Sequence, residues 1–123
     1  MERRESMIND IRLSPHFKLC EFQCRCCGTV KLSPELLELL EDLRAEGGAP
    51  LVITSGFRCA AHNRAVGGAD RSAHLEGRAA DVFARPSAQL SLRRAAERLG
   101  FSEIICGGRR NYIHLASERG ASA

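Results

Sequence analysis

The sequence predicts an α+β domain in which helices pack on a small antiparallel or mixed sheet. Two segments, 33–46 and 87–99, carry apolar residues at helical spacing, and several short apolar runs between and after them indicate strands. Helices and strands alternate only loosely, and the last two strand-like runs, 102–106 and 111–115, form a hairpin. This order of elements favours an α+β fold.

The chain of 123 residues is long enough for one domain with a modest core. Residues 1–15 are polar and carry no regular pattern, so we expect a flexible segment there. The domain is expected over 16–118, with a tail over 119–123. Its first part, 17–22, can form a short strand or a turn packed on the core.

The helix over 33–46 has the clearest signals. Ser33 can cap it, Pro34 suits the first helical position, and Gly47-Gly48 ends it. A buried strand over 51–54 and a short helix over 59–66 follow.

A second strand is expected over 79–84. Pro86 then precedes the helix over 87–99, and Gly100 ends that helix.

Composition excludes several functions. With a net charge of +3, no Trp and one Tyr, the chain lacks the basic stripe and the stacking platform of a nucleic-acid-binding protein. No apolar run approaches the length of a membrane span. Residues 1–6 are charged and no apolar segment follows them, so we expect no secretory signal. We expect a monomer.

Six cysteines leave three alternatives open: reduced thiols, disulfides, or a second metal at Cys24/Cys27. The lack of an export signal argues against disulfides. Cys24 and Cys27 have zinc-knuckle spacing, but no second Cys-x-x-Cys pair occurs in the chain. The cysteines are Cys20, Cys24, Cys26, Cys27, Cys59 and Cys106.

The strongest chemical signal is a histidine and an aspartate, His74 and Asp81, on a short segment between glycines and an apolar strand. Both side chains are good zinc ligands, and two ligands from one segment need a third from elsewhere. His114 lies in a comparable apolar run. The three predict one zinc ion with a fourth position open for water, which is the layout of a catalytic site.

This segment also resembles a known family. The pattern Ser-x-His-x-x-Gly-x-Ala-x-Asp, met at residues 72–81, is similar to that of the M15 zinc peptidases: D-Ala-D-Ala carboxypeptidases, D-Ala-D-Ala dipeptidases and phage L-Ala-D-Glu endolysins. These share a fold with the amino-terminal signalling domain of hedgehog proteins. Ser55-Gly56-Phe57-Arg58 and His62-Asn63 resemble upstream segments of the same family, so the likeness runs from about residue 17 to 115.

The resemblance implies a zinc metallopeptidase that cleaves peptidoglycan peptides in the bacterial cell wall, at a bond involving a D-amino acid. It also implies that Arg58 and Ser72 bind substrate. A guanidinium suits a carboxylate or polarised carbonyl, because its fork donates two parallel hydrogen bonds. Without a signal peptide, such an enzyme reaches the wall after lysis, by another export route or in a phage particle.

The acid/base residue departs from the family pattern. Many relatives carry Asp or Glu three residues before the second histidine, and here that residue is Asn111. Relatives also often carry Asp two residues after it, where this chain has Ala116. The alternative function is therefore a catalytically inactive zinc-binding domain with a wall-binding or phage-particle structural role.

The final hairpin offers a replacement carboxylate. If residues 107–110 form its loop, Cys106 pairs with Asn111, and Glu103 lies directly opposite His114 on the same face. Glu103 is then the candidate general acid/base, unless it is simply a solvated residue on an edge strand. Glu76 and Glu118 are the alternatives.

Overall fold

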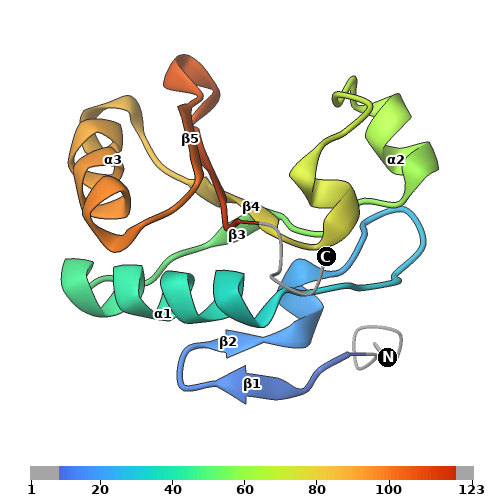
Figure 1. Cartoon of the computed structure of the whole chain (residues 1–123), viewed down its shortest axis with the longest axis horizontal. Helices are drawn as coiled ribbons and strands as arrows, with labels where there is room; N and C mark the ends of the chain where they lie inside the picture. Colours follow the sequence, from blue (N-terminus) through green and yellow to red (C-terminus); the bar gives the residue numbers. More distant parts are fainter. Residues whose placement is uncertain (1–8, 119–123) are drawn as a thin grey trace, which may run out of the picture.

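The computed structural model describes residues 9–118, and the α+β prediction is confirmed (Figure 1). Its helices are α1 (Pro34–Gly47), α2 (Ala60–Ala65) and α3 (Pro86–Leu99), with 3-10 turns η2 (Leu19–Phe22), η3 (Ala73–Glu76) and η4 (Gly108–Arg110). The strands are β1 (Arg12–Ser14), β2 (Phe17–Lys18), β3 (Ile53–Ser55), β4 (Ala79–Phe83), β5 (Glu103–Cys106) and β6 (Tyr112–Ala116). Among these residues, no helix has the length and apolarity needed to cross a membrane.

The main sheet has the strand order β3-β4-β6-β5, and every neighbouring pair is antiparallel. Strands β4 and β6 lie side by side at its centre, although α3 and β5 separate them in sequence. A second, two-stranded sheet pairs β1 with β2 beneath α1 in Figure 1. The prediction of an antiparallel or mixed sheet therefore resolves to an antiparallel one.

Alternation along the central strands gives the main sheet two different faces. Ala80 and Val82 of β4 are fully buried in the hydrophobic core, whereas Asp81 between them faces the other way. The core is built from the main sheet, α1, α3 and the N-terminal β2 and η2. Its fully buried large side chains include Phe17, Phe22, Leu36, Leu40, Leu43, Val82, Ile113 and Leu115. The opposite face of the sheet carries Asp81 and His114, which are strand partners.

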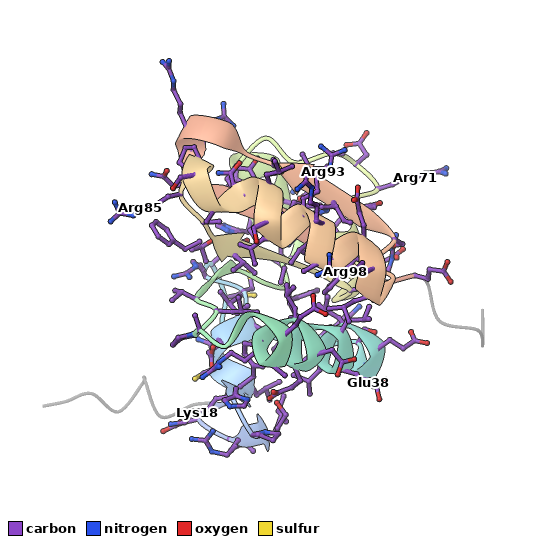
Figure 2. The ribbon with its side chains drawn as sticks, turned by 90° about the vertical axis from the view of Figure 1, so that its left-hand side faces the viewer. Lys18, Glu38, Arg71, Arg85, Arg93 and Arg98 are labelled. Carbon is purple, nitrogen blue, oxygen red and sulfur yellow. The ribbon has the colours of Figure 1, made fainter. Side chains whose placement is uncertain are left out.

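Helix α1 forms for the reasons its sequence suggests. The Ser33 hydroxyl accepts a hydrogen bond from the Leu36 N–H, Pro34 occupies the first turn, and Gly48 adopts the left-handed conformation at φ 69° that ends the helix. Burial of each leucine in its apolar stripe contributes about 2 kcal/mol to the stability of the fold. Helix α3 begins at Pro86 itself. Figure 2 shows the arginines around it, of which Arg98 contacts Glu46 of α1 at 2.6 Å.

The N-terminal part is more ordered than its composition predicts, because residues 12–14, within the segment expected to be flexible, form strand β1. Residues 1–8 lie outside the described range. A single carboxylate of α1, Glu41, accepts hydrogen bonds from the Ser14 hydroxyl and the His16 N–H, at 2.6 and 2.7 Å. Residues 17–22 form both predicted alternatives, a short strand followed by a turn.

The register predicted for the final hairpin is wrong by two residues. Glu103 is the partner of Ala116, and Ile105 is the partner of His114. The turn still has four residues, but they are 108–111 rather than 107–110, because Gly108–Arg110 forms η4 and Asn111 takes the left-handed conformation at φ 63°. The ladder therefore begins with the Gly107 N–H donating to the Tyr112 carbonyl at 2.8 Å. A shift of two preserves the face, so Glu103 still projects on the side of His114.

Candidate metal centre

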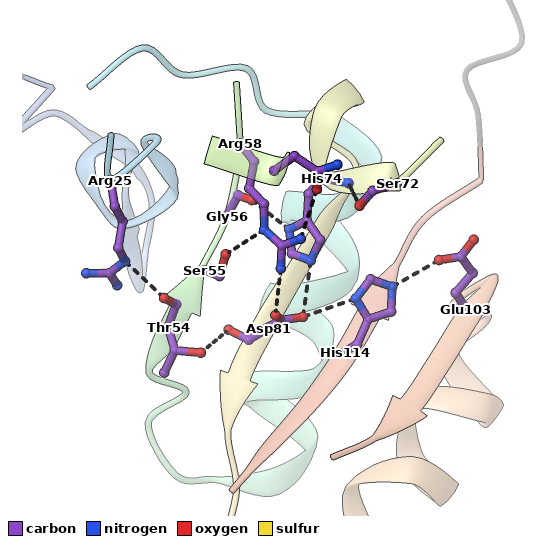
Figure 3. A network of polar contacts seen from close by, with 11 residues as sticks. Arg25, Thr54, Ser55, Gly56, Arg58, Ser72, His74, Asp81, Glu103 and His114 are labelled. Carbon is purple, nitrogen blue, oxygen red and sulfur yellow. Dashed lines mark hydrogen bonds and ion pairs between the residues drawn. The ribbon is translucent and has the colours of Figure 1, made fainter. Parts of the chain in front are cut away.

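Three potential ligands meet on the face of the main sheet that carries Asp81 (Figure 3). One nitrogen of His74, one carboxylate oxygen of Asp81 and one nitrogen of His114 all lie within 4.8 Å of one another. The three side chains are only 2%, 14% and 12% exposed, in that order. The sequence motif and the distant strand β6 thus converge on one partly buried site.

His74 is positioned by the short turn η3. The Ser72 hydroxyl caps this turn by accepting a hydrogen bond from the His74 N–H at 3.1 Å. On the ring, Nδ1 lies 2.7 Å from the Gly56 carbonyl oxygen, which can only accept, so Nδ1 carries the proton. The other ring nitrogen, Nε2, faces Asp81 Oδ1 at 3.2 Å and is the nitrogen that His74 offers to a metal. A backbone carbonyl that fixes the tautomer in this way is typical of metal-binding histidines.

The glycine of the motif is needed for two reasons. Gly77 ends η3 at φ 72°, a conformation that favours glycine. A Cβ atom there would also meet the Lys31 carbonyl oxygen at 2.5 Å. Gly77 therefore allows η3 to pack closely on the segment before α1 while it holds His74 over β4.

Asp81 and His114 are direct partners across the central strands. Oδ1 of Asp81 lies 3.0 Å from Nδ1 of His114, and the opposite ring nitrogen, Nε2, lies 2.9 Å from Oε1 of Glu103. Nδ1 is therefore the nitrogen that His114 offers to a metal, and Glu103 holds the far side of the ring. The Glu103 side chain is 46% exposed, so its carboxylate lies at the boundary between site and solvent.

Arg58 borders the centre from the segment between β3 and α2. Its Nη2 lies 3.4 Å from Oδ2 of Asp81, and its Nη1 donates to Oδ1 of Asn63 at 3.1 Å. Gly68 makes this approach possible, because a Cβ atom there would lie 2.1 Å from the Asn63 oxygen. The guanidinium is 13% exposed and is held in one orientation beside the site.

The electrostatics of the cluster favour a cation. Burial raises the pKa of Asp81, but hydrogen bonds with His114 and His74 outweigh it and hold that pKa well below its usual range. Burial lowers the pKa of His114, while hydrogen bonds with Asp81 and Glu103 raise it more, so the net shift is upward. The site thus keeps an ionised carboxylate between two imidazoles.

The donor set fits zinc. Two imidazole nitrogens and one carboxylate oxygen are its usual protein ligands in catalytic sites, where three protein ligands leave a fourth position open. Each histidine also has an outer partner on its other nitrogen, the Gly56 carbonyl for His74 and the Glu103 carboxylate for His114. The sequence analysis placed Glu103 beside His114, but as a proton carrier, and it did not indicate the Gly56 contact, which depends on tertiary packing.

The comparison with protein families agrees with this geometry. The family model described as Peptidase M15 matches residues 15–116, which include the whole site. The chain belongs to the peptidase M15 family. Among curated proteins, it is 37% identical over 79 residues to the zinc D-Ala-D-Ala carboxypeptidase of Streptomyces albus G. That alignment covers 62% of this chain and 31% of the relative, so the chain spans under a third of the relative's length.

Two residues of this M15 chain, Asn111 and Ala116, stand where the family resemblance leads one to expect a carboxylate. Asn111 follows η4 in the left-handed conformation, and its carbonyl accepts a hydrogen bond from the Ala84 N–H at 2.9 Å. Ala116 is fully buried, and its strand partner is Glu103. A carboxylate at residue 116 and one at residue 103 would therefore project side by side from the same face of the sheet.

The other predicted M15 site residues lie less centrally. Ser72 contacts the site through its cap on His74 rather than through an exposed hydroxyl of its own. Glu76 pairs with Arg78 at 2.6 Å, outside the ligand cluster. Glu118, the last described residue, is exposed.

Proposed function

We propose that this protein is a zinc-dependent peptidase that cleaves peptidoglycan peptides of the bacterial cell wall, at a bond involving a D-amino acid. The observation that carries the proposal is the convergence of His74, Asp81 and His114 within 4.8 Å in a chain of the M15 family. The similarity to a zinc D-Ala-D-Ala carboxypeptidase supports the metal and the substrate class.

His74, Asp81 and His114 would hold the zinc ion, through Nε2, a carboxylate oxygen and Nδ1. Zinc in such a site supplies a Lewis acid that activates water and the scissile carbonyl. The protein's contribution is to hold the proton of each imidazole on the nitrogen that faces away from the metal, and to keep Asp81 ionised. The hydrogen bonds described for the two rings and the low pKa of Asp81 favour those states.

Glu103 is the proposed proton carrier of this reaction. It would take the proton of the attacking water and return it to the leaving amine, a role that contributes roughly 10²- to 10⁴-fold to the rate. Support comes from its place across from Ala116, because a carboxylate on β5 can stand in for one on β6. In the structure its carboxylate contacts Nε2 of His114 at 2.9 Å, on the far side of the ring from the ligating nitrogen, so it would have to leave this contact to act on the water.

Arg58 is the proposed anchor for the substrate. Its guanidinium borders Asp81 and is already held by Asn63, so little side-chain entropy remains to be lost when a substrate carboxylate or carbonyl binds. A planar fork fixed beside a metal orients a peptide with two parallel hydrogen bonds.

The same face of the sheet also offers apolar contacts. Ile105 is the strand partner of His114 and is 55% exposed, and Phe83, two residues beyond Asp81 on β4, is 45% exposed. Alternation puts both side chains on the face of the metal centre. This strip suits the methyl groups of alanine residues in a wall peptide.

Incubation of the purified protein with peptidoglycan, followed by labelling of new amino groups, tests the proposal. New amino termini within stem peptides indicate an endopeptidase, whereas release of free terminal D-alanine indicates a carboxypeptidase. Activity should disappear on chelation, return with zinc, and be absent in a His74→Ala/His114→Ala double variant.

A catalytically inactive zinc-binding domain is the second candidate, and the amide at Asn111 favours it. This candidate predicts that the zinc-loaded protein sediments with peptidoglycan but releases no amino groups. Binding without cleavage in the loaded protein would establish it and overturn the enzymatic proposal.

A further inference from the structure

A second cluster of potential metal ligands lies outside the M15 site. The sulfur atoms of Cys24, Cys27 and Cys59 all lie within 4.8 Å of one another, and none is in a disulfide. We refer to these three residues as the thiol cluster. Cys24 and Cys27 come from the loop after η2, whereas Cys59 comes from the segment that joins β3 to α2. Cys59 thus supplies a third ligand, although the sequence has no second Cys-x-x-Cys pair.

The loop that carries Cys24 and Cys27 is closed by its own backbone. The Cys24 N–H donates to the Thr29 carbonyl at 2.7 Å, and the Gly28 N–H donates to the Cys24 carbonyl at 2.8 Å. Gly28 takes the left-handed conformation at φ 77°, directly after Cys27. A tight turn at this point brings two cysteines of Cys-x-x-Cys spacing to one side, as a metal knuckle requires.

Backbone donors surround the sulfur atoms. The Cys59 N–H donates to Cys24 Sγ at 3.4 Å, and Cys59 Sγ in turn caps α2 by accepting from the His62 N–H at 3.4 Å. Two of the three sulfur atoms thus accept hydrogen bonds from backbone N–H groups, an environment that suits the thiolate, the form that binds metals.

We propose that Cys24, Cys27 and Cys59 bind a second zinc ion, with a structural role. Three thiolates around a tetrahedral zinc at about 2.3 Å lie about 3.8 Å apart, so a group already within 4.8 Å needs only a small contraction. An all-sulfur donor set selects zinc over harder cations. The exposed Cys26, which precedes Cys27 in the same loop, is the candidate fourth ligand.

The position of this site explains what it stabilises. Cys59 directly follows Arg58, and the Phe57 N–H donates to the Phe22 carbonyl at 2.8 Å. Arg25, inside the cysteine loop, donates to the Thr54 carbonyl of β3 at 3.0 Å, and the Thr54 hydroxyl donates to the Asp81 carbonyl at 3.2 Å (Figure 3). A zinc ion in the thiol cluster would clamp the N-terminal segment to the strand and loop that present Arg58.

A disulfide is the competing use of these thiols. It joins two sulfur atoms at about 2.05 Å and leaves the third unpaired, whereas a metal uses all three. The three-way grouping favours the metal, and the two states differ in mass and in zinc content.

Zinc analysis of the reduced full-length protein tests the proposal. We expect two zinc ions per chain in the wild type, and one in Cys59→Ser or in His74→Ala/His114→Ala. Cys106→Ser is the matched control, because Cys106 lies on β5 outside the cluster, and it should keep two. Replacement of zinc by Co²⁺ should give thiolate-to-cobalt charge-transfer absorption in the wild type and in the histidine double variant, but not in Cys59→Ser.

The number of zinc ions bound by each variant distinguishes the thiol cluster from the M15 centre. One zinc in the wild type that is lost in the histidine double variant but retained in Cys59→Ser would overturn the second site and leave the first intact. A disulfide among Cys24, Cys27 and Cys59 in the wild type isolated from cells would also overturn it. If Cys59→Ser does not fold, alkylation of the wild type decides: protection of three or four thiols that chelator abolishes supports the site, and equal reactivity with and without chelator refutes it.

Discussion

Glu103 contacts His114 without being its strand partner. Oε1 of Glu103 lies 2.9 Å from Nε2 of His114, while the backbone pairs Glu103 with Ala116 and His114 with Ile105. The carboxylate therefore reaches diagonally across the strand pair and rests on the far side of the ring from Asp81. This contact gives Glu103 an orienting role in addition to the proton transfer proposed for it.

Glu103→Gln separates these two roles. A glutamine keeps the shape and can still accept a hydrogen bond from Nε2, so zinc content and thermal stability should stay unchanged. If Glu103 carries the proton, cleavage of peptidoglycan should fall by about 10²- to 10⁴-fold. A loss of less than about tenfold would restrict Glu103 to positioning His114. Glu97→Gln, on the exposed face of α3, is the matched control and should cleave normally.

Arg58→Lys should reduce turnover while zinc content stays full. Lysine retains the positive charge but loses the planar fork and the contacts with Asn63 and Asp81. We expect kcat/KM to fall roughly tenfold or more, from the loss of a charge-assisted hydrogen bond. Loss of zinc from the M15 centre in this variant would instead show that Arg58 maintains the site's structure.

Zinc affinity at the M15 centre should weaken as pH falls. Zinc needs an unprotonated Nδ1 on His114, and the pKa of His114 in the metal-free protein is raised above 6.5. Below that raised pKa, protons compete with zinc and the apparent affinity falls about tenfold per pH unit. Protonation of Asp81 does not contribute to this pH dependence, because the pKa of Asp81 is well below its usual value.

Competition titrations with a zinc-binding dye across pH measure this dependence. In Glu103→Gln, one of the groups that raise the pKa of His114 is gone, so the decline should begin at a lower pH. An affinity that does not change between the two ends of the titration would contradict the assignment of His114 as a ligand.

Ile105→Ser should weaken substrate binding and leave the metal unaffected. Ile105 is the strand partner of His114, so its exposed side chain lies beside the metal centre on the face proposed to bind the peptide. Loss of about 1 kcal/mol of apolar contact raises KM by roughly fivefold. Leu90→Ser is a closely matched control, because Leu90 lies on α3 and is exposed to the same extent, 55%. Equal kinetics for the two variants would exclude this surface from the binding site.

Glu41→Gln should destabilise the protein by about 1.5–3 kcal/mol, the value of hydrogen bonds to a charged group. Burial raises the pKa of Glu41, but contacts with Ser14 and His16 lower it more. The stabilisation is therefore complete above the ordinary value of 4.5 and is lost as pH falls through the lower pKa of the folded state. Denaturant unfolding between pH 3 and 7 checks this, with the exposed Glu38→Gln as the control that should unfold like the wild type.

The sequence predicted the parts of the fold that depend on local chemistry. Helix α1 begins at its serine cap and ends at Gly47 before the left-handed Gly48, and the motif places His74 and Asp81 together because η3 and β4 are consecutive. The hairpin register could not be predicted from the sequence, because it depends on a tertiary contact. Gln89 of α3 fixes the turn by hydrogen bonding to both the N–H and the carbonyl of Gly108, each at 2.9 Å. The thiol cluster was equally hidden, since Cys59 joins it only through tertiary packing.

If the proposed centre holds zinc, the central position of β4 and β6 ties the lifetime of this protein to its zinc supply. Asp81 and His114 lie 33 residues apart, so their half of the centre exists only when the two middle strands have paired. Zinc held by the proposed centre would bind that paired state and not the open chain, and a hundredfold excess over its dissociation constant would add about 2.7 kcal/mol to the free energy of unfolding. A cell or medium poor in zinc would therefore leave more of the chain transiently open to proteases, whatever its catalytic competence.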